Sequence, residues 1–432
     1  MVKTPGWLVV LIICVIPILL WSQNGPLVQR FSSPLVTLLS LGQIAALLGL
    51  SLFCLSIILS GRFKFFESLF GGMNRVYIAH HIIGGLAFIS LLFHPALIMS
   101  TYLFTSAKSA LRLLLPSVSN WPLNFGLAAH FLLTSLLIIT FYSRLPYHIW
   151  RLTHKFLGLT LFLASLHAFF IPSDISSFFP LRIYMLSLVT LSLSIHVYRT
   201  VLGRFLVRRT PYRVNSINPL AGGSVTQIVF TPVDKPIKFD PGQFIFINLK
   251  DNKLSETHPF SINSPPDSPN ITIAAKAIGD YTRELPSLKP KTTALIEGPF
   301  GRFSYLYYPQ KNHIWIAGGI GITPFMSMAS SLPNHPDYQI DLYYSVKDKS
   351  EAVYLNELLG LAKSLPNLRL SPHFTSLSGR LDAQTILKSS SARISPAIFI
   401  CGPPPMMENL RNQFHQLGIP HHKIHTEEFS LQ

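Results

Sequence analysis

Six long apolar runs dominate the first half of the chain. They cover residues 7–22, 36–59, 76–102, 125–142, 155–171 and 180–201, and a helix needs roughly 17–25 mostly apolar residues to cross a bilayer. The first run is the shortest, but no small-residue cleavage pattern lies before the WSQNG segment at 21–25. We therefore expect it to remain as a helix. The pattern predicts an α-helical bundle with six transmembrane spans.

The hydrophobic pattern changes after residue 211. Short strand-like runs, YRVNSI, VTQIVFTPV, GQFIFINL and ITIAAKAI, are separated by Pro, Gly, Asp and Asn turns, which predicts an antiparallel β-barrel. From residue 312 strand-like and helix-like segments alternate, in the order HIWIAGG, ITPFMSMASSL, YQIDLYYSV and ELLGLAKSL. This alternation predicts an α/β domain with a parallel, nucleotide-binding sheet. The fold class is thus multi-domain.

Composition and charge agree with a membrane-embedded half. The 432 residues are 49% hydrophobic and 12% charged, whereas about a quarter of the residues in a soluble domain are charged. Basic residues follow the second, fourth and sixth runs: Arg62, Lys64, Arg75; Arg144, Arg151, Lys155; Arg199, Arg204, Arg208, Arg209, Arg213. The positive-inside rule places these loops, and both termini, in the cytoplasm. The net charge of +16 then reflects mostly the membrane topology. The sequence contains no basic recognition motif that would indicate nucleic-acid binding.

Two histidine pairs lie in separate apolar runs, His80 with His94 and His154 with His167. Ionisable side chains inside transmembrane segments are costly and usually functional. His80 and His94 are fourteen positions apart, which puts them on nearly one helix face about 21 Å apart. His154 and His167 are thirteen apart, which leaves roughly 140° of phase error in a straight helix. A tilt, a local bulge or a ring rotation must absorb that error.

The direction of the helices sorts these histidines by depth. Both carrier helices are expected to start at the cytoplasmic side, so His80 and His154 share an inner level and His94 and His167 an outer one. Two neutral imidazoles can bind one metal from opposite sides, as they do in bis-histidine haems. The pattern therefore predicts two metal centres stacked across the bilayer.

Three other histidines compete with this interpretation. His81 is adjacent to His80 and thirteen positions from His94, so helical phase favours His80 without excluding His81. His130 and His196 have no partner at the same level. For these two, an interhelical hydrogen bond is the ordinary expectation.

A glycine-rich turn links a predicted strand to a predicted helix at IAGGIGITPFMSM. Gly318, Gly319 and Gly321 lack side chains, so backbone N–H groups can approach a pyrophosphate at the helix N-terminus. Thr323 can cap that helix and donate to phosphate. The turn is therefore a candidate phosphate-binding loop.

Further motifs appear in order: HPFSI at 258–262, KAIGDYT at 276–282, EGPFG at 297–301, GGIGITP at 318–324, CGPPPMM at 401–407 and EEF at 427–429. This set resembles the ferredoxin-reductase-type flavin and nicotinamide module. Together with the histidine-bearing helices, residues 70–432 resemble the ferric reductase/NADPH oxidase superfamily. The resemblance implies a transmembrane bis-haem domain at 1–203, an FAD-binding β-barrel at 204–307 and an NAD(P)H-binding α/β domain at 308–432.

The resemblance also implies roles for individual residues. The flavin ring would contact His258, Pro259, Phe260 and Ser261, and the FAD phosphates would contact Lys276, Gly279 and Thr282. The pyrophosphate of the nicotinamide cofactor would contact Gly318, Gly319, Gly321, Thr323 and Pro324. Cys401, Gly402 and Pro403 would lie beside the nicotinamide, and Phe429, with Glu427 nearby, would cover the flavin ring. The catalytic candidates are Phe429, Cys401 and Glu427.

The preferred nicotinamide cofactor follows from three positions. Ser345 and Lys347 come after the strand YQIDLYYSV, and Arg380 lies in SGRLD. In this module such positions tend to meet the 2′-phosphate, which favours NADPH, although Lys347 lies in a charged turn where a solvated lysine is ordinary. NADH stays open as an alternative.

The resemblance implies an oxidoreductase of the plasma (inner) membrane. Electrons would pass from cytoplasmic NADPH through FAD and two b-type haems, held by His80 with His154 and His94 with His167, to an acceptor outside. Oxygen, giving superoxide, is the first expectation; a ferric chelate, or a protein or quinone partner, is an alternative. Arg30, Lys108 and Arg112 near the outer face can attract an anionic chelate or a haem propionate. No residue in the sequence separates these acceptors.

Overall fold

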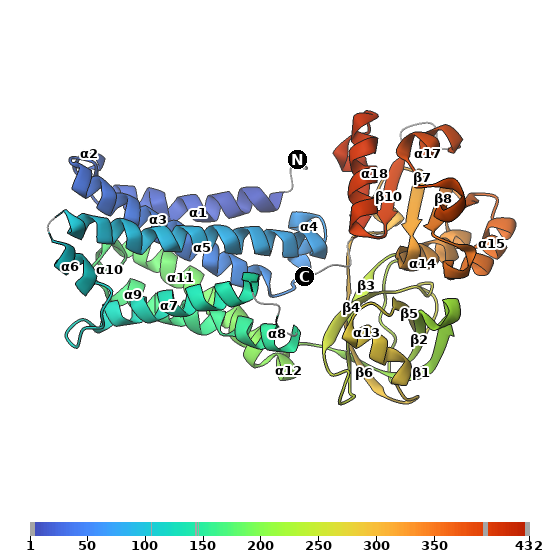
Figure 1. Cartoon of the computed structure of the whole chain (residues 1–432), viewed down its shortest axis with the longest axis horizontal. Coiled ribbons are helices and arrows are strands. Elements are labelled where there is room, and N and C mark those ends of the chain that lie inside the picture. Colours follow the sequence, from blue (N-terminus) through green and yellow to red (C-terminus); the bar gives the residue numbers. More distant parts are fainter. Residues whose placement is uncertain (1–4, 105, 143–144, 146, 392–395, 428–432) are drawn as a thin grey trace. The chain divides into compact units, whose positions relative to one another are not determined.

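The computed structural model describes residues 5–427 except 105, 143–144, 146 and 392–395. The chain divides into a helical unit that ends at Val207 and a mixed α/β unit that begins at Arg208. Figure 1 shows both units, and each is described by itself below. Within the described part, six helices are long and apolar enough to span a membrane, which confirms the expected helical bundle.

The helical unit consists of long helices that run alongside one another (Figure 1). Its long helices are α1 (Pro5–Gln23), α3 (Pro34–Leu59), α5 (Met73–Leu103), α7 (Trp121–Tyr142), α9 (Leu157–Phe170) and α11 (Phe179–His196). The short helices α4 (Lys64–Phe70), α8 (Tyr147–Lys155) and α12 (Gly203–Leu206) lie at one end of the bundle, and α2 (Leu27–Arg30), α6 (Ala107–Arg112) and α10 (Asp174–Ser177) lie at the other. The π-helix η1 (Val197–Val201) continues α11. The chain leaves the bundle at the α4–α8–α12 end.

The fifth span is interrupted near its first turns. Helix α8 ends at Lys155 and α9 begins at Leu157, and Phe156 between them has φ −68° and ψ −10°. His154 lies on α8 and His167 on α9, so the two histidines do not belong to one straight helix. This break is the local irregularity that the thirteen-residue spacing required.

The first half of the mixed unit is a curled antiparallel sheet. Its strands are β1 (Thr210–Leu220), β2 (Val225–Pro232), β3 (Phe244–Leu249), β4 (Thr257–Ser261), β5 (Ile271–Lys276) and β6 (Thr293–Phe300), in the order β4-β3-β6-β1-β2-β5. Backbone N–H of Asn263 donates to Thr272 O at 2.9 Å, which brings the two ends of that order together. Four strands match the predicted runs. The sequence pattern missed β4 and β6, since each contains a proline (Pro259 and Pro299) that is atypical of a strand.

The second half is a five-stranded parallel sheet with helices on both faces, as predicted. The strands β7 (Asn312–Gly318), β8 (Gln339–Val346), β9 (Leu368–Phe374), β10 (Ala397–Cys401) and β11 (Ile424–Glu427) lie in the order β11-β10-β7-β8-β9. Helices α14 (Thr323–Ser331) and α15 (Leu355–Ser364) pack on one face, and α17 (Ala383–Ser389) and α18 (Pro404–Gln416) on the other. The short helices α13 (Asp280–Glu284) and α16 (Thr375–Ser378) lie in connections.

Strand alternation creates the two cores of this sheet. On β7, Trp315 faces the core under α14 and α15, whereas Ile314 and Ile316 face the core under α17 and α18. All three side chains are fully buried, which explains why the strand reads as one continuous apolar run. The sheet therefore presents its carboxyl edge, rather than a face, to any ligand.

A buried tyrosine ties the barrel to the parallel sheet. The Tyr354 hydroxyl accepts from Gln227 Nε2 at 3.0 Å and from Asn263 Nδ2 at 2.7 Å. Burial raises the pKa of Tyr354 to about 12, so the hydroxyl keeps its proton. These bonds hold the segment that follows β4 against the α/β core.

The buried imidazole of His313 makes the stability of the parallel sheet depend on pH. His313 Nε2–H donates to Gln310 O at 2.8 Å, and the ring stacks on Phe399 at 5.2 Å. Burial lowers the pKa of His313 to about 4, against about 6.5 in the unfolded chain. Between those values the unfolded chain binds more protons, so stability falls as the pH falls through that window and is constant above it.

We expect acidification from pH 7.5 to 4.5 to cost the mixed unit about 2–3 kcal/mol through this residue. The His313→Phe variant should lose that part of the pH dependence, because phenylalanine does not titrate. Urea titration of the purified full chain, read by pulse proteolysis of the mixed unit at several pH values, measures the slope. Equal slopes for both proteins would contradict the assignment.

Candidate functional site

The structure brings the four predicted histidines together as two facing pairs inside the helical bundle. The ring centroids of His80 on α5 and His154 on α8 are 6.2 Å apart. Those of His94 on α5 and His167 on α9 are 6.3 Å apart. Because α5 runs the length of the bundle, the two pairs lie at two different levels. The first level is nearer the end at which the chain leaves through α12.

The ring spacing fits two imidazoles on one metal. If a metal–imidazole bond is about 2.0 Å and the ring centre lies about 1.1 Å behind the nitrogen, two opposed rings have centroids about 6.2 Å apart. Among the described residues, no group of three or more His, Cys, Asp or Glu side chains could hold a bare metal ion. A group that brings its own equatorial nitrogens and needs only two axial imidazoles, such as haem, fits this donor set.

Backbone carbonyls orient three of the four rings. Nδ1 of His80 lies 2.8 Å from Ser56 O, Nδ1 of His94 lies 3.0 Å from Gly42 O, and Nδ1 of His167 lies 2.9 Å from Pro122 O. A carbonyl oxygen can only accept, so each Nδ1 carries the hydrogen. Nε2 then keeps its lone pair, which is the tautomer that a metal ligand requires.

His154 is oriented differently. Its Nδ1 is buried and has no hydrogen-bond partner among the residues that the structure describes. The ring instead stacks on Trp150, with centroids 5.2 Å apart and planes 21° apart. Sequence reasoning missed Trp150, although its position four residues before His154 on one helix is a usable signal.

Missing side chains make room for the rings. A Cβ on Gly126 would lie 2.6 Å from Nδ1 of His167, and a Cβ on Gly84 would lie 3.2 Å from Ser56 Oγ. Close approach of helices at small residues is typical of membrane bundles. The anchoring carbonyls have no sequence signature, so only the structure identifies them.

The competing histidines take other positions. His81 is exposed on the outside of α5, and its ring is 5.5 Å from that of His80. The ring of His196 lies against Gly158, where an added Cβ would be 2.1 Å from its Nε2. His130 is half-buried on α7. The structure thus pairs His80, rather than His81, with His154.

Two of the predicted flavin-ring residues, His258 and Phe260, form an aromatic cluster with Tyr281 on the barrel. His258 and Phe260 are two positions apart on β4, so they point to the same face of the strand. The centroid of the Tyr281 ring lies 3.9 Å from that of His258 and 6.4 Å from that of Phe260. Glu256 Oε2 lies 3.0 Å from His258 Nε2. Burial, and then the nearby carboxylates, raise the pKa of Tyr281, so its hydroxyl stays neutral. The sequence motifs did not single out Tyr281 or Glu256.

The side chain of Ser261 indicates whether a flavin can bind on this strand. Its Oγ is buried and has no hydrogen-bond partner in the described part of the chain. A buried hydroxyl without a partner costs free energy, and a polar ligand edge would supply the missing bond. Pro259 lies two residues earlier on the same half-buried strand.

The candidate phosphate turn of the barrel is held by its own threonine. Thr282 Oγ1 accepts from Ile278 N–H at 3.0 Å and from Gly279 N–H at 3.1 Å. This hydroxyl is therefore used in shaping the turn before α13. Lys276 Nζ lies 4.0 Å from Glu351 Oε2, at an exposed position where such a pair contributes little.

Strand register collects the nucleotide candidates at one edge. In the parallel sheet Gly318 pairs with Ser345, Ala317 with Cys401, and Cys401 with Glu427. These residues lie at the last or the penultimate position of β7, β8, β10 and β11. Nucleotides bind at the carboxyl edge of such sheets, so the predicted residues converge at the expected place.

Glycines allow the loops after β7 and β10 to touch. A Cβ on Gly321 would lie 2.3 Å from Cys401 O, and one on Gly318 would lie 2.9 Å from Pro403 Cδ. A Cβ on Gly402 would lie 3.0 Å from Gly318 Cα. Gly319 differs, since it has φ +54° and faces open space. Its backbone is thus the accessible part of the turn.

Thr323 does not cap the helix, so that expectation was wrong. The N-cap residue of α14 is Ile322, and Thr323 is its first residue. The Thr323 hydroxyl is buried and donates to Ile320 O at 3.1 Å, which stabilises the glycine turn from inside. Pro324 follows in the first turn, where a missing N–H has no cost.

The remaining candidates divide into buried and exposed groups. Burial, and then Glu427, raise the pKa of the fully buried Cys401 well above its usual value, so it is a thiol rather than a thiolate. Ser345 is buried, whereas Lys347 and Arg380 are exposed. Phe429 lies outside the described residues.

Family models match three successive parts of the chain. Residues 45–165 match the ferric reductase like transmembrane component, 212–304 match an FAD-binding domain, and 315–412 match the oxidoreductase NAD-binding domain. The helical unit therefore belongs to an integral membrane protein, and the mixed unit contains FAD- and NAD(P)H-binding domains.

Several curated proteins are similar over part of their length. A superoxide-generating NADPH oxidase heavy chain of Dictyostelium discoideum is 32% identical over 121 residues, which are 23% of this chain and 17% of that protein. Ferric reduction oxidase 7 of Arabidopsis thaliana is 29% identical over 149 residues, 30% of this chain and 20% of that protein. The chain thus spans a fifth or less of the length of these relatives.

Among solved structures, flavohemoglobin from Malassezia yamatoensis, with bound FAD and heme, covers 92% of this chain and 98% of its own, with a TM-score of 0.52 and 18% identity. At that identity the likeness concerns the fold alone.

Replacing Gly321 with alanine should damage the nucleotide edge. The new Cβ would meet the backbone of Cys401 and Gly402 at 2.3–2.7 Å, and forcing the loops apart costs about 1–3 kcal/mol. We expect KM for the nicotinamide cofactor to rise roughly 5- to 150-fold. Gly360→Ala is the matched control, because a Cβ there meets no atom within 4 Å. Unchanged KM in Gly321→Ala would show that this contact does not shape the binding edge.

Proposed function

Because the chain belongs to the ferric reductase/NADPH oxidase superfamily, we propose that it transfers electrons from NADPH, across the membrane, to oxygen. NADPH would bind at the carboxyl edge of the parallel sheet and FAD on the barrel, with domain limits at 1–203, 204–307 and 308–432. Bound FAD and two b-type haems would supply the redox chemistry.

The single observation that supports this proposal most is the double pair of rings at 6.2 and 6.3 Å. In the proposal His80 and His154 hold the inner haem, and His94 and His167 hold the outer one. Carbonyl bonds to Nδ1 keep three of the rings in the ligand tautomer and raise their basicity. Two centres at different depths divide the span into two shorter electron transfers.

The proposed direction follows from charge and chain connectivity. The basic loops and the exit of the chain through α12 are at the same end of the bundle as His80 and His154. With these loops in the cytoplasm of a plasma membrane, both termini are cytoplasmic. The mixed unit then lies on the side where NADPH is available.

The flavin and nicotinamide residues have separate tasks in this proposal. The buried Ser261 hydroxyl would bond the flavin edge, and the aromatic pair of His258 and Tyr281 would pack beside it. The neutral Cys401 thiol and the buried Glu427, at adjacent strand ends, would border the nicotinamide and exclude water. Phe429 would cover the flavin until the nicotinamide arrives.

Oxygen is proposed as the acceptor because one of the outer cations is already paired. Arg30 forms an ion pair with Asp174 at 2.6 Å, and both side chains are about six-sevenths buried. Its charge is therefore compensated and gives little attraction for an anionic chelate. Exposed Lys108 and Arg112 remain as cations, so ferric-chelate reduction is the alternative that the acceptor assay includes.

Replacing His94 with alanine should remove the outer haem. We expect haem per FAD in the purified chain to fall from about two to about one, because the remaining imidazole cannot hold the outer group alone. Electron delivery to the far side should be lost, while NADPH-driven reduction of FAD continues. Pyridine haemochrome absorbance and flavin bleaching measure the two quantities.

His130→Ala is the matched control, since His130 is a half-buried membrane histidine outside both pairs. It should keep both haems. A colourless unmodified protein after reconstitution with haem, or an unchanged haem content in His94→Ala, would contradict the assignment.

The acceptor is tested with the unmodified protein in liposomes. Cytochrome c reduction that superoxide dismutase abolishes is expected with NADPH and oxygen. Faster reduction of a ferric chelate under argon, without superoxide in air, would favour the ferric-reductase alternative. Turnover only after addition of a quinone or protein fraction would favour a role as an electron-transfer component for that partner.

Cofactor preference should depend on the charges beyond β8 and β9. Lys347→Ala should lower kcat/KM for NADPH roughly 10- to 150-fold, because one charge-assisted phosphate contact of about 1.5–3 kcal/mol is lost. The value for NADH should stay unchanged. Lys363→Ala, another exposed lysine of the same domain, is the control. Equal efficiencies for NADPH and NADH in the unmodified protein would overturn the 2′-phosphate assignment.

A further inference from the structure

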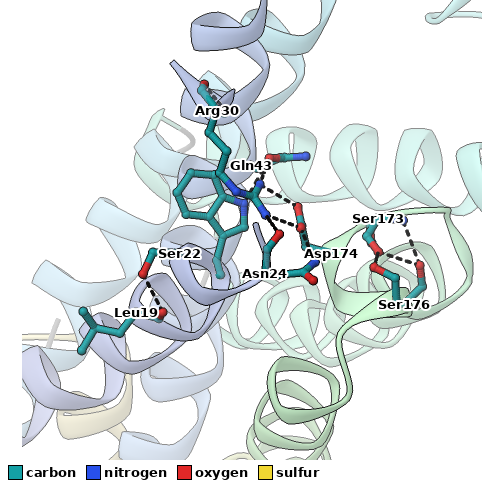
Figure 2. Close-up of polar contacts among 11 residues, drawn as sticks. Leu19, Ser22, Asn24, Arg30, Gln43, Ser173, Asp174 and Ser176 are labelled. Atoms are coloured by element: carbon teal, nitrogen blue, oxygen red, sulfur yellow. Dashed lines mark hydrogen bonds and ion pairs between the residues drawn. The ribbon is translucent and has the colours of Figure 1, made fainter. Parts of the chain in front are cut away.

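A buried polar cluster lies at the α2–α10 end of the helical bundle. Figure 2 shows Arg30 directed at Asp174, with Asn24 and Gln43 beside it. Arg30 Nη2 donates to Asp174 Oδ1 at 2.6 Å and Nη1 to Oδ2 at 3.3 Å, so the pair is bidentate. Asn24 Nδ2 donates to the same carboxylate at 2.7 Å. We call Trp21, Asn24, Arg30, Gln43 and Asp174 the Arg30 cluster.

The Arg30 cluster joins helices that are far apart in sequence. Gln43 Oε1 on α3 accepts from Trp21 Nε1 on α1 at 3.1 Å and from Arg30 Nη1 at 3.3 Å. The Arg30 guanidinium also stacks over the Trp21 ring at 4.1 Å. The Arg30 carbonyl accepts from Ser40 Oγ on α3 at 2.7 Å. Three hydrogen bonds therefore fix the N-terminal part of α3: one from Trp21, one from the Arg30 side chain and one to the Arg30 carbonyl.

The held part of α3 contains an anchor of the outer histidine pair. Gly42 precedes Gln43, and its carbonyl accepts the Nδ1–H of His94 at 3.0 Å. Helix α5 packs directly on this point, since a Cβ on Gly42 would lie 2.8 Å from Ile98 Cδ1. A rotation or shift of α3 would move the Gly42 carbonyl away from the His94 ring.

A bidentate arginine–carboxylate pair is directional, and Gln43 transmits its position to the backbone. Gln43 is bonded by both Trp21 and Arg30, and Gly42 is its neighbour in the same helical turn. The bonds to Gln43 therefore limit how far the Gly42 carbonyl can rotate about the helix axis. The carbonyl that His80 bonds, Ser56 O, also belongs to α3, but it lies fourteen residues after Gly42, outside the turns that the Arg30 cluster contacts.

We propose that Arg30 and Asp174 are positioning residues for His94: they hold α3 so that the Gly42 carbonyl keeps its bond to His94 Nδ1. This inference rests on the proposed function, in which His94 binds the outer haem. The bond raises the basicity of the imidazole, and ligand basicity is one control on the potential of a bound metal. Weakening it should make the outer centre easier to reduce.

The first test is a double variant, Arg30→Gln with Asp174→Asn, in the purified full chain. Removing both charges avoids leaving one buried and unpaired, which would destabilise the fold. We expect both haems to remain bound. In a redox titration the outer component, identified as the one lost in His94→Ala, should shift to a more positive potential, and its low-spin EPR signal should shift. The inner component should stay unchanged.

Two further variants keep the test decisive. Gln43→Leu has a similar volume and removes only the link from the Arg30 cluster to α3, so it should produce the same selective shift and replaces the double variant if that does not accumulate. Arg204→Gln removes an exposed cation of the helical unit on α12, at the other end of the bundle, and should shift neither component. It controls for the change in charge.

The outcomes separate this inference from the proposed function. If both the double variant and Gln43→Leu leave the outer potential and EPR signal unchanged, the positioning role is wrong while two haems remain. Equal shifts of both components would also overturn it, because they indicate a general loosening of the bundle. If His94→Ala retains both haem signals, the ligand assignment itself fails.

Discussion

One constraint organises the helical unit: four imidazole rings lie in two pairs inside a mostly apolar bundle. A buried polar ring without a partner is expensive in lipid. The structure meets that cost with backbone carbonyls at Ser56, Gly42 and Pro122, each about 3 Å from a ring nitrogen. These bonds also fix the tautomer, because a carbonyl oxygen accepts and the hydrogen must therefore be on Nδ1.

Helix spacing follows from this constraint. The break at Phe156 turns His154 and His167 towards α5 from two separate helices, and Gly126 leaves the space that the His167 ring occupies. The Gly42 carbonyl, which His94 bonds, lies beside Gln43, and Gln43 accepts a hydrogen bond from Arg30. The two pairs differ in what orients their rings, since His154 stacks on Trp150 whereas the other three rings bond backbone carbonyls.

In the mixed unit the corresponding constraint is strand register. Parallel pairing places Gly318, Ser345, Cys401 and Glu427 at one edge, although they are up to 109 positions apart in the sequence. Glycines at the loop contacts let the backbones of the loops after β7 and β10 approach closely. Tyr354, which follows β8, accepts hydrogen bonds from Gln227 and Asn263 of the barrel, and these bonds connect the barrel with the parallel sheet.

The sequence by itself predicted the spans and the parallel sheet, because hydrophobic period and chain length are local signals. It also selected four histidines, whose rings the structure brings into two pairs. The flavin and nicotinamide motifs, and their order along the chain, can also be recognised in the sequence. The sequence did not reveal β4 and β6, where prolines obscure the strand pattern, and it expected Thr323 to cap α14, whereas Thr323 is the first residue of that helix. Only the tertiary structure decided which carbonyl meets which imidazole and how Arg30 reaches Gln43. Those contacts join distant segments through backbone atoms, which are the same in every residue and carry no signature in a sequence.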